Sequence, residues 1–167
     1  MYDIGNAMYD KAERYYNAAM VFNEREIFDA PFIIESEIAT ECFLSSIIEK
    51  IYNKPMQDIF GHGCVPHDLA RLYDKLYPSK GKAGNSNPLL PAYDGSFRTR
   101  LTAAYLDYGA LRYPNDSNSQ RGMRIVGEKS IRDDIKLLED TKNIADYFRQ
   151  KSYEQISDIQ AEENVER

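Results

Sequence analysis

The seven prolines of this 167-residue chain divide it into segments whose apolar residues recur at helical spacing. Proline disrupts a helix interior because it lacks the amide hydrogen and clashes with the preceding turn. Valine and threonine number only four each, and no stretch alternates apolar and polar residues as a half-buried strand does. The prolines fall between the helix-like segments, at positions 31, 55, 66, 78, 88, 91 and 114. The sequence therefore predicts an all-α fold.

The apolar stripes predict an antiparallel up-and-down bundle of four to five helices with two long loops. The segment after Pro31 is apolar over more than half its circumference, so we expect it to be the central helix. Asp68 and Ser96 are expected to cap the two helices that follow them. The helices are expected near residues 4–28, 31–53, 67–77, 96–112 and 128–150, with a connector over 54–66 and loops over 78–92 and 114–126.

Length and composition indicate one globular domain. We expect residues 1–152 to form a single helical domain and residues 153–167 an acidic tail that frays or extends the last helix. No apolar run approaches the length of a membrane-spanning helix, and the first residues do not resemble a secretory signal. Two cysteines give no disulfide framework, which favours a cytoplasmic location.

Charge is distributed unevenly along the chain, whose overall net charge is -6. Residues 78–127 hold seven basic and three acidic residues, whereas the segments on both sides are acidic. A locally basic segment in an acidic protein can attract an anion at one place without coating the surface with nucleic acid. The alternative is a solvated surface that is rich in arginine.

One cluster of possible metal ligands and one further cysteine suggest catalytic or metal chemistry, and neither fits an established pattern. His62, Cys64, His67 and Asp68 could all bind zinc, but their spacing matches no zinc motif. Cys42 lies on the apolar stripe of the central helix and is expected to be a core residue. No phosphate-binding loop and no Gly-x-Ser-x-Gly elbow occur. We therefore predict no metal site, no cofactor and no catalytic residue.

Glu37 and Glu41 lie within the apolar arc of the central helix, and a buried carboxylate requires a partner. The available partners are Arg98, Arg100, Arg112 and His67. Arg112 is in turn flanked by tyrosines at positions 105, 108 and 113. Arginine beside tyrosine can hold a phosphate and stack a base, although tyrosines also serve as core or dimer packing.

Three further segments occur in order along the chain. They are IATECFLSSIIEK with Ala39, Glu41 and Leu44, then VPHDLARLYDKL with His67, Asp68 and Leu69, then YLDYGALRYP with Arg112, Tyr113 and Pro114. Together they resemble the HEPN domain (higher eukaryotes and prokaryotes nucleotide-binding). In that family an A-x-E-x-x-L-K helix is followed by an H-D-L helix and by a helix that ends in R-Y-P. The resemblance covers about residues 5–150, with Ser45 in place of the usual lysine.

The resemblance implies a helical bundle that forms a two-fold dimer and binds nucleotide or RNA. Many relatives are ribonuclease toxins, or partners of small nucleotidyltransferases, in toxin–antitoxin and stress systems. Active relatives carry arginine followed four to six residues later by histidine. Neither His62 nor His67 has arginine at the required positions, so the nuclease motif is absent.

The sequence therefore predicts a HEPN-like domain that binds a nucleotide or RNA phosphate without cleaving it. Under the alternative interpretation the bundle only dimerises or docks a partner protein, such as a nucleotidyltransferase, and has no small ligand. A divergent metal enzyme built on the histidines is a weaker third reading. The residues expected at the ligand site are Arg112, Tyr113, Tyr108, His67, Arg98, Arg100 and Glu41.

Overall fold

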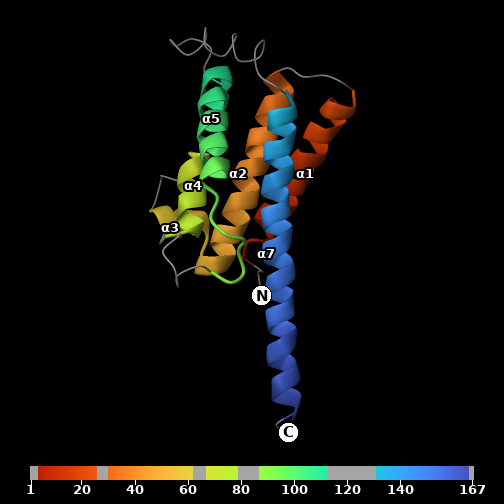
Figure 1. Cartoon of the computed structure of the whole chain (residues 1–167), viewed down its shortest axis with the longest axis vertical. Helices are drawn as coiled ribbons and strands as arrows, with labels where there is room; N and C mark the ends of the chain where they lie inside the picture. Colours follow the sequence, from red (N-terminus) through yellow and green to blue (C-terminus); the bar gives the residue numbers. More distant parts are fainter. Residues whose placement is uncertain (1–3, 26–29, 62–66, 79–86, 113–130, 166–167) are drawn as a thin grey trace.

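The chain is all-helical throughout the part that the computed structural model describes, which is residues 4–25, 30–61, 67–78, 87–112 and 131–165. No strand occurs in these ranges, so the predicted all-α class is confirmed. None of the described helices combines the length and the apolar composition that crossing a membrane requires. Figure 1 shows the helices α1 (Asn6–Glu24), α2 (Ala30–Tyr52), α3 (Met56–Phe60), α4 (Leu69–Leu76), α5 (Gly95–Arg112) and α7 (Ile131–Val165).

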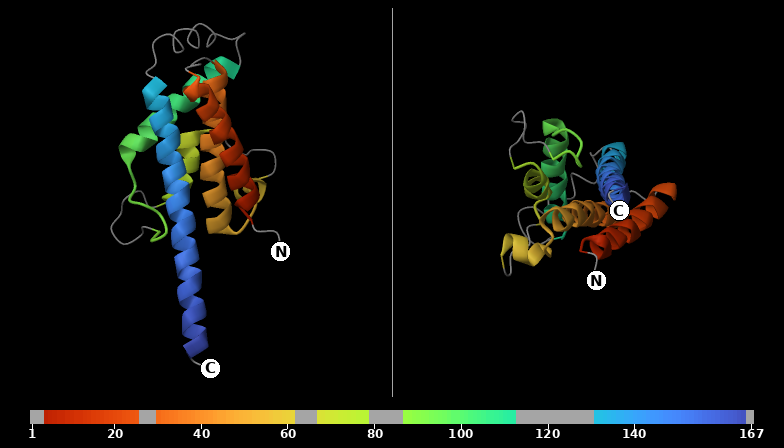
Figure 2. Two further views of the ribbon diagram at one scale, coloured as in Figure 1. Left: turned by 90° about the vertical axis from the view of Figure 1, so that its right-hand side faces the viewer. Right: turned by 90° about the horizontal axis from the view of Figure 1, so that it is seen from below.

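Helix α2 is the centre of the fold, as its wide apolar arc predicted. It packs against all five of the other described helices. Figures 1 and 2 show α1 and α7 on one side of it and α3, α4 and α5 on the other. Its fully buried side chains include Phe32, Phe43, Leu44, Ile47 and Ile48. Because nonpolar area on every side of α2 is removed from water, this helix supplies more buried apolar residues than any other described helix.

Helix α1 begins in close contact with α2. Gly5 precedes α1 with a φ of +89°, a conformation that glycine adopts without strain. A Cβ at this position would lie 2.6 Å from the Ser46 carbonyl oxygen and 2.7 Å from Cγ of Lys50. The absence of a side chain therefore lets the start of α1 approach the backbone of α2.

A polar cluster joins α1 to α7. The buried Tyr9 donates its hydroxyl hydrogen to Asp146, and the guanidinium carbon of Arg149 lies 3.9 Å from the centre of the Tyr9 ring. Lys142 donates to Asp146 at 2.7 Å and lies 3.4 Å from Glu13. Burial acts to lower the pKa of Lys142, but its hydrogen bond to Asp146 and nearby negative groups raise it above the usual value. Lys142 is therefore charged at neutral pH.

The predicted boundaries were right for α2 and wrong in two other places, whereas the tail takes one of the two forms expected for it. α1 ends at Glu24 instead of residue 28, and residues 26–29 lie outside the described ranges. The predicted connector contains a further helix, α3, whose first amide donates to Glu49 at 3.0 Å. α7 continues to Val165, so the acidic tail extends the last helix and does not fray within the described residues.

Replacing Gly5 by alanine is expected to destabilise the fold by about 2 kcal/mol or more. Alanine is strained in the left-handed backbone conformation of this residue, and its Cβ would overlap with the backbone of α2. Urea denaturation of the two proteins measures the loss. Gly95→Ala is the control, since a Cβ there meets its nearest atom at 3.9 Å. Equal stability of the Gly5 and Gly95 variants would contradict the close approach.

Cys42 is 3% exposed, and burial raises the pKa of its thiol to about 11. The expected thiolate fraction at about pH 8 is roughly one thousandth, so the folded protein should react slowly with a thiol reagent. A Cys64→Ser variant isolates this thiol, and its rate should rise at least roughly a hundredfold in urea. Equal rates in the folded and unfolded states would show that Cys42 is accessible.

Candidate functional site

Two tyrosines hold the chain that leads into α5: Tyr73 lies within α4, and Tyr77 follows it directly. The Asp94 amide donates to the Tyr73 hydroxyl at 3.0 Å, and the Tyr77 hydroxyl donates to the Pro91 carbonyl at 3.0 Å. The Tyr73 ring also packs against Phe97, with centroids 5.0 Å apart. Burial raises the pKa of both tyrosines, so both hydroxyls stay neutral at physiological pH. The path of residues 91–97 is thereby fixed against α4.

Helix α5 is capped by Asp94 and not by Ser96 as the sequence suggested. The Asp94 carboxylate accepts hydrogen bonds from the amides of Ser96 at 2.8 Å and Phe97 at 3.2 Å. The helix consequently begins at Gly95, with Ser96 already inside its first turn. A carboxylate at this position satisfies free amides and interacts favourably with the helix dipole. Arg98 and Arg100 therefore project from the firmly anchored start of α5.

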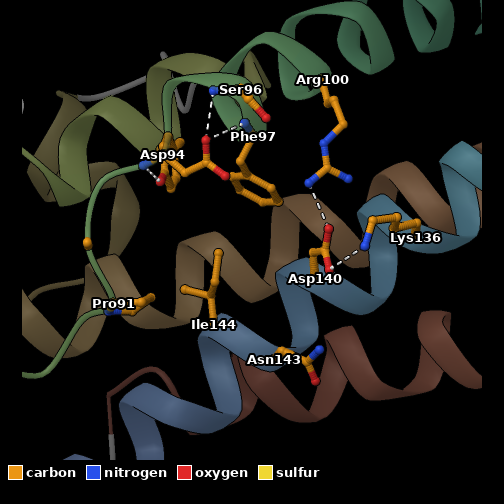
Figure 3. A pocket seen from close by; sticks show the side chains of 11 residues that line it. Pro91, Asp94, Ser96, Phe97, Arg100, Lys136, Asp140, Asn143 and Ile144 are labelled. Atoms are coloured by element: carbon orange, nitrogen blue, oxygen red, sulfur yellow. Dashed lines mark hydrogen bonds and ion pairs between the residues drawn. The ribbon is translucent and has the colours of Figure 1, made fainter.

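A groove of about 490 Å³ lies between the start of α5 and the first half of α7 (Figure 3). We call it the α5–α7 groove. α4 contributes Tyr73 to its wall, and the loop before α5 contributes Pro91 and Ala92. The remaining lining residues are Asp94, Ser96, Phe97 and Arg100 from α5 and the residue before it, and Lys136, Asp140, Asn143 and Ile144 from α7.

Arg100 is the predicted site residue that lines this groove. Its Nη2 donates to Asp140 at 2.7 Å, and its guanidinium carbon lies 5.3 Å from the centre of the Phe97 ring. Its Nη1 is buried and has no hydrogen-bond partner among the residues that the structure describes. A buried donor without an acceptor is costly, so the guanidinium gains from any rearrangement that gives Nη1 an acceptor.

The charges lining the groove balance. Arg100 and Lys136 are opposed by Asp140 and Asp94, and Asp140 lies within 3.7 Å of Lys136. Asp94 already accepts from the α5 amides, which leaves Asp140 as the carboxylate shared between the two cations. Figure 3 shows Asp140 between them. A nearly neutral groove of this kind suits one anionic group better than a polyphosphate.

Arg98 does not line the groove. Its Nε and Nη2 donate to the two carboxylate oxygens of Asp74, each at 2.8 Å. The hydrogen bonds with Asp74 raise the pKa of Arg98 above its usual value. Because both sides of this two-pronged contact are filled, Arg98 joins α5 to α4 and has less capacity left for a phosphate.

His67 contacts Glu41, which gives that glutamate one of the partners expected for it. The His67 Nδ1 lies 3.1 Å and 3.0 Å from the two carboxylate oxygens. The His67 side chain is 56% exposed, so the contact lies at the surface between α2 and the start of α4. Asp68 beside it accepts from the Arg71 amide at 3.1 Å, which confirms its predicted role as the cap of α4.

The side chains of the remaining predicted residues lie outside the part of the chain that the structure describes. Tyr108 and Arg112 belong to α5, which ends at Arg112, but their side chains lie outside the described part. Tyr113 lies wholly outside it, as do His62 and Cys64. The meeting of Arg112 with His67 at one anion site stays a prediction. Among the described residues, no group of three metal-ligating side chains occurs.

Sequence reasoning missed the contribution of α7 to the groove. Lys136, Asp140 and Asn143 recur at spacings of four and three, which places them on one face of α7 beside its apolar stripe. This periodicity was a usable signal for a polar face. The packing of α5 against α7, which brings Arg100 to that face, depends on contacts between distant parts of the chain.

The chain matches no family model, no curated protein and no solved structure.

Proposed function

We propose that the chain is a HEPN-like antiparallel bundle that binds a nucleotide or RNA phosphate without cleaving it, and that the phosphate binds in the α5–α7 groove. The observation that carries the proposal is Arg100, which lines the groove and whose buried Nη1 has no acceptor within the described part of the chain. As the HEPN resemblance implies, we assign this activity to the cytoplasm and to a toxin–antitoxin or stress system.

The chemistry of the lining suits a single phosphate with an organic group attached. A guanidinium that turns toward the groove can offer parallel N–H donors to two phosphate oxygens. Asn143 is exposed and offers an amide donor and acceptor, while Pro91 and Ile144 supply apolar walls. No histidine or cysteine is among the residues that line the groove, and the sequence lacks the nuclease motif. We therefore propose binding without cleavage.

Arg100→Gln should weaken the binding of AMP, ATP or a short RNA by about tenfold or more, because the charged donor is lost. Asp140→Asn should strengthen binding severalfold, because it frees the guanidinium and removes a negative charge. Isothermal titration calorimetry measures both dissociation constants. Arg98→Gln is the matched control: it removes an arginine from the same helix turn, one that is held by Asp74, and should change affinity little.

Absence of binding for all three ligands, even at millimolar concentration, would overturn the ligand proposal. Equal losses of affinity in the Arg98 and Arg100 variants would contradict binding in the groove. They would show that the ligand binds elsewhere, or that it responds only to the net positive charge of α5.

A second candidate function, a helical dimerisation or protein-interaction module without a small ligand, is favoured by one observation. α7 extends well beyond the other helices (Figure 1), and Tyr153 and Ile156 on the extension are 53% and 52% exposed. Large apolar side chains on an exposed helix are typical of an interaction surface. A homodimer, or a complex with a small nucleotidyltransferase, is the assembly that the HEPN resemblance implies.

Deleting residues 151–167 should abolish such an assembly while leaving the bundle folded, because Phe148 is the last buried residue of α7 among the side chains that the structure describes. The measurement is co-purification with a co-expressed small nucleotidyltransferase, together with the molar mass of the chain alone. Ligand binding in the groove should survive the deletion, since every groove residue precedes it. An unchanged assembly would exclude the extension as the interaction surface.

A further inference from the structure

A second hollow, of about 350 Å³, lies between α1 and α2 and shares no lining residue with the α5–α7 groove. Lys11, Arg14, Tyr15 and Ala18 line it from one face of α1, and Glu35 lines it from α2. Figures 1 and 2 show these two helices side by side. We call this feature the α1–α2 hollow. Its volume is in the range of sites that bind small molecules.

The three charged residues of the hollow do not pair with one another. Within the described part of the chain, neither Lys11 nor Arg14 forms an ion pair or a hydrogen bond with Glu35. The Lys11 ammonium lies 6.0 Å from the centre of the Tyr15 ring, and Arg14 is exposed. Both cations can therefore bind a ligand without first giving up a carboxylate, unlike Arg100 in the α5–α7 groove.

Glu35 is half-buried, and no described cation balances its charge. Burial alone raises the pKa of its carboxyl group, because no basic side chain of the described residues lies near enough to lower it. An ionised carboxylate that is partly removed from water without a partner is unfavourable. A ligand that brings a positive group to Glu35 would remove this cost.

The signs and the number of these charges indicate the class of ligand. Glu35 would repel an anion that has no positive group, whereas Lys11 and Arg14 would repel a polyamine. A molecule with two anionic groups and one cationic group matches the lining. Aspartate and glutamate have this composition, since each carries two carboxylates and one ammonium group at neutral pH. Arginine binds a carboxylate through two parallel N–H donors, which also favours such a ligand.

We propose that the α1–α2 hollow binds a free acidic amino acid, either aspartate or glutamate. Arg14 and Lys11 each bind one carboxylate, and Glu35 accepts hydrogen bonds from the ammonium group. The methylene groups of the ligand lie along the Tyr15 ring and Ala18. This site is separate from the phosphate site proposed above, so either proposal can fail without the other.

Isothermal titration calorimetry with glutamate and with aspartate tests the proposal. At least one of them should bind with a dissociation constant in the millimolar range or below. Arg14→Gln should weaken this binding by about tenfold or more, because the two-pronged donor is lost. Arg25→Gln is the matched control: Arg25 directly follows α1, is exposed and does not line the hollow, so its loss should change affinity little.

Glutarate isolates the role of Glu35, because it has the two carboxylates of glutamate without the ammonium group. It should bind the wild-type chain about tenfold more weakly than glutamate does. Glu35→Gln should weaken glutamate binding by about tenfold and should not weaken glutarate binding. Glu24→Gln, which removes an exposed carboxylate at the end of α1, should leave the affinity for both ligands unchanged.

Thermal denaturation without ligand distinguishes a binding role of Glu35 from a structural one. Because the ionised carboxylate is unfavourable in the empty hollow, Glu35→Gln should be at least as stable as the wild-type chain. A structural carboxylate would instead lose stability on this substitution.

The proposal would be overturned if neither amino acid binds at millimolar concentration. It would equally be overturned if Arg14→Gln weakens binding no more than Arg25→Gln does, or if Glu35→Gln affects glutamate and glutarate alike.

Discussion

Burial of α2 on all sides is the constraint on which the rest of the structure depends. A helix that is apolar over most of its surface is stable only when other helices surround it, and all five other described helices contact α2. The amphipathic helices around it need to bury only one face each. This arrangement leaves the outward faces of α5 and α7 free to carry polar groups, and the α5–α7 groove forms where those two faces meet.

Three of the predicted site residues pair with a carboxylate that lies on a different helix of the bundle. Arg98 contacts Asp74, Arg100 contacts Asp140, and His67 contacts Glu41. These pairs join α5 to α4, α5 to α7, and the start of α4 to α2. Such partly exposed pairs contribute little stability individually, but they fix where each cation lies. They also offset part of the positive charge of the arginine-rich segment.

The sequence predicted the features that local periodicity controls. Proline positions and apolar stripes located α2, α4 and α5 closely, and the cap at Asp68 follows from local chemistry. α3 was missed because its five residues lie in a segment rich in glycine and proline, and its first amide is held by Glu49 of α2. Asp94 replaced Ser96 as the cap of α5 because Tyr73 holds the Asp94 amide from another helix. The groove could not be predicted because periodicity does not specify which outward faces meet.

The polar cluster between α1 and α7 fixes how far α7 extends beyond the rest of the bundle. If the residues of α7 that face α1 were all aliphatic, α7 could shift along its axis by one helical turn with little loss of stability. Here a slide would carry the ammonium of Lys142 away from Glu13, and would lift Arg149 off the Tyr9 ring. The cluster thus locks the longitudinal position of α7. How far its tip reaches past the bundle is consequently set at residues 142–149, well inside the folded core.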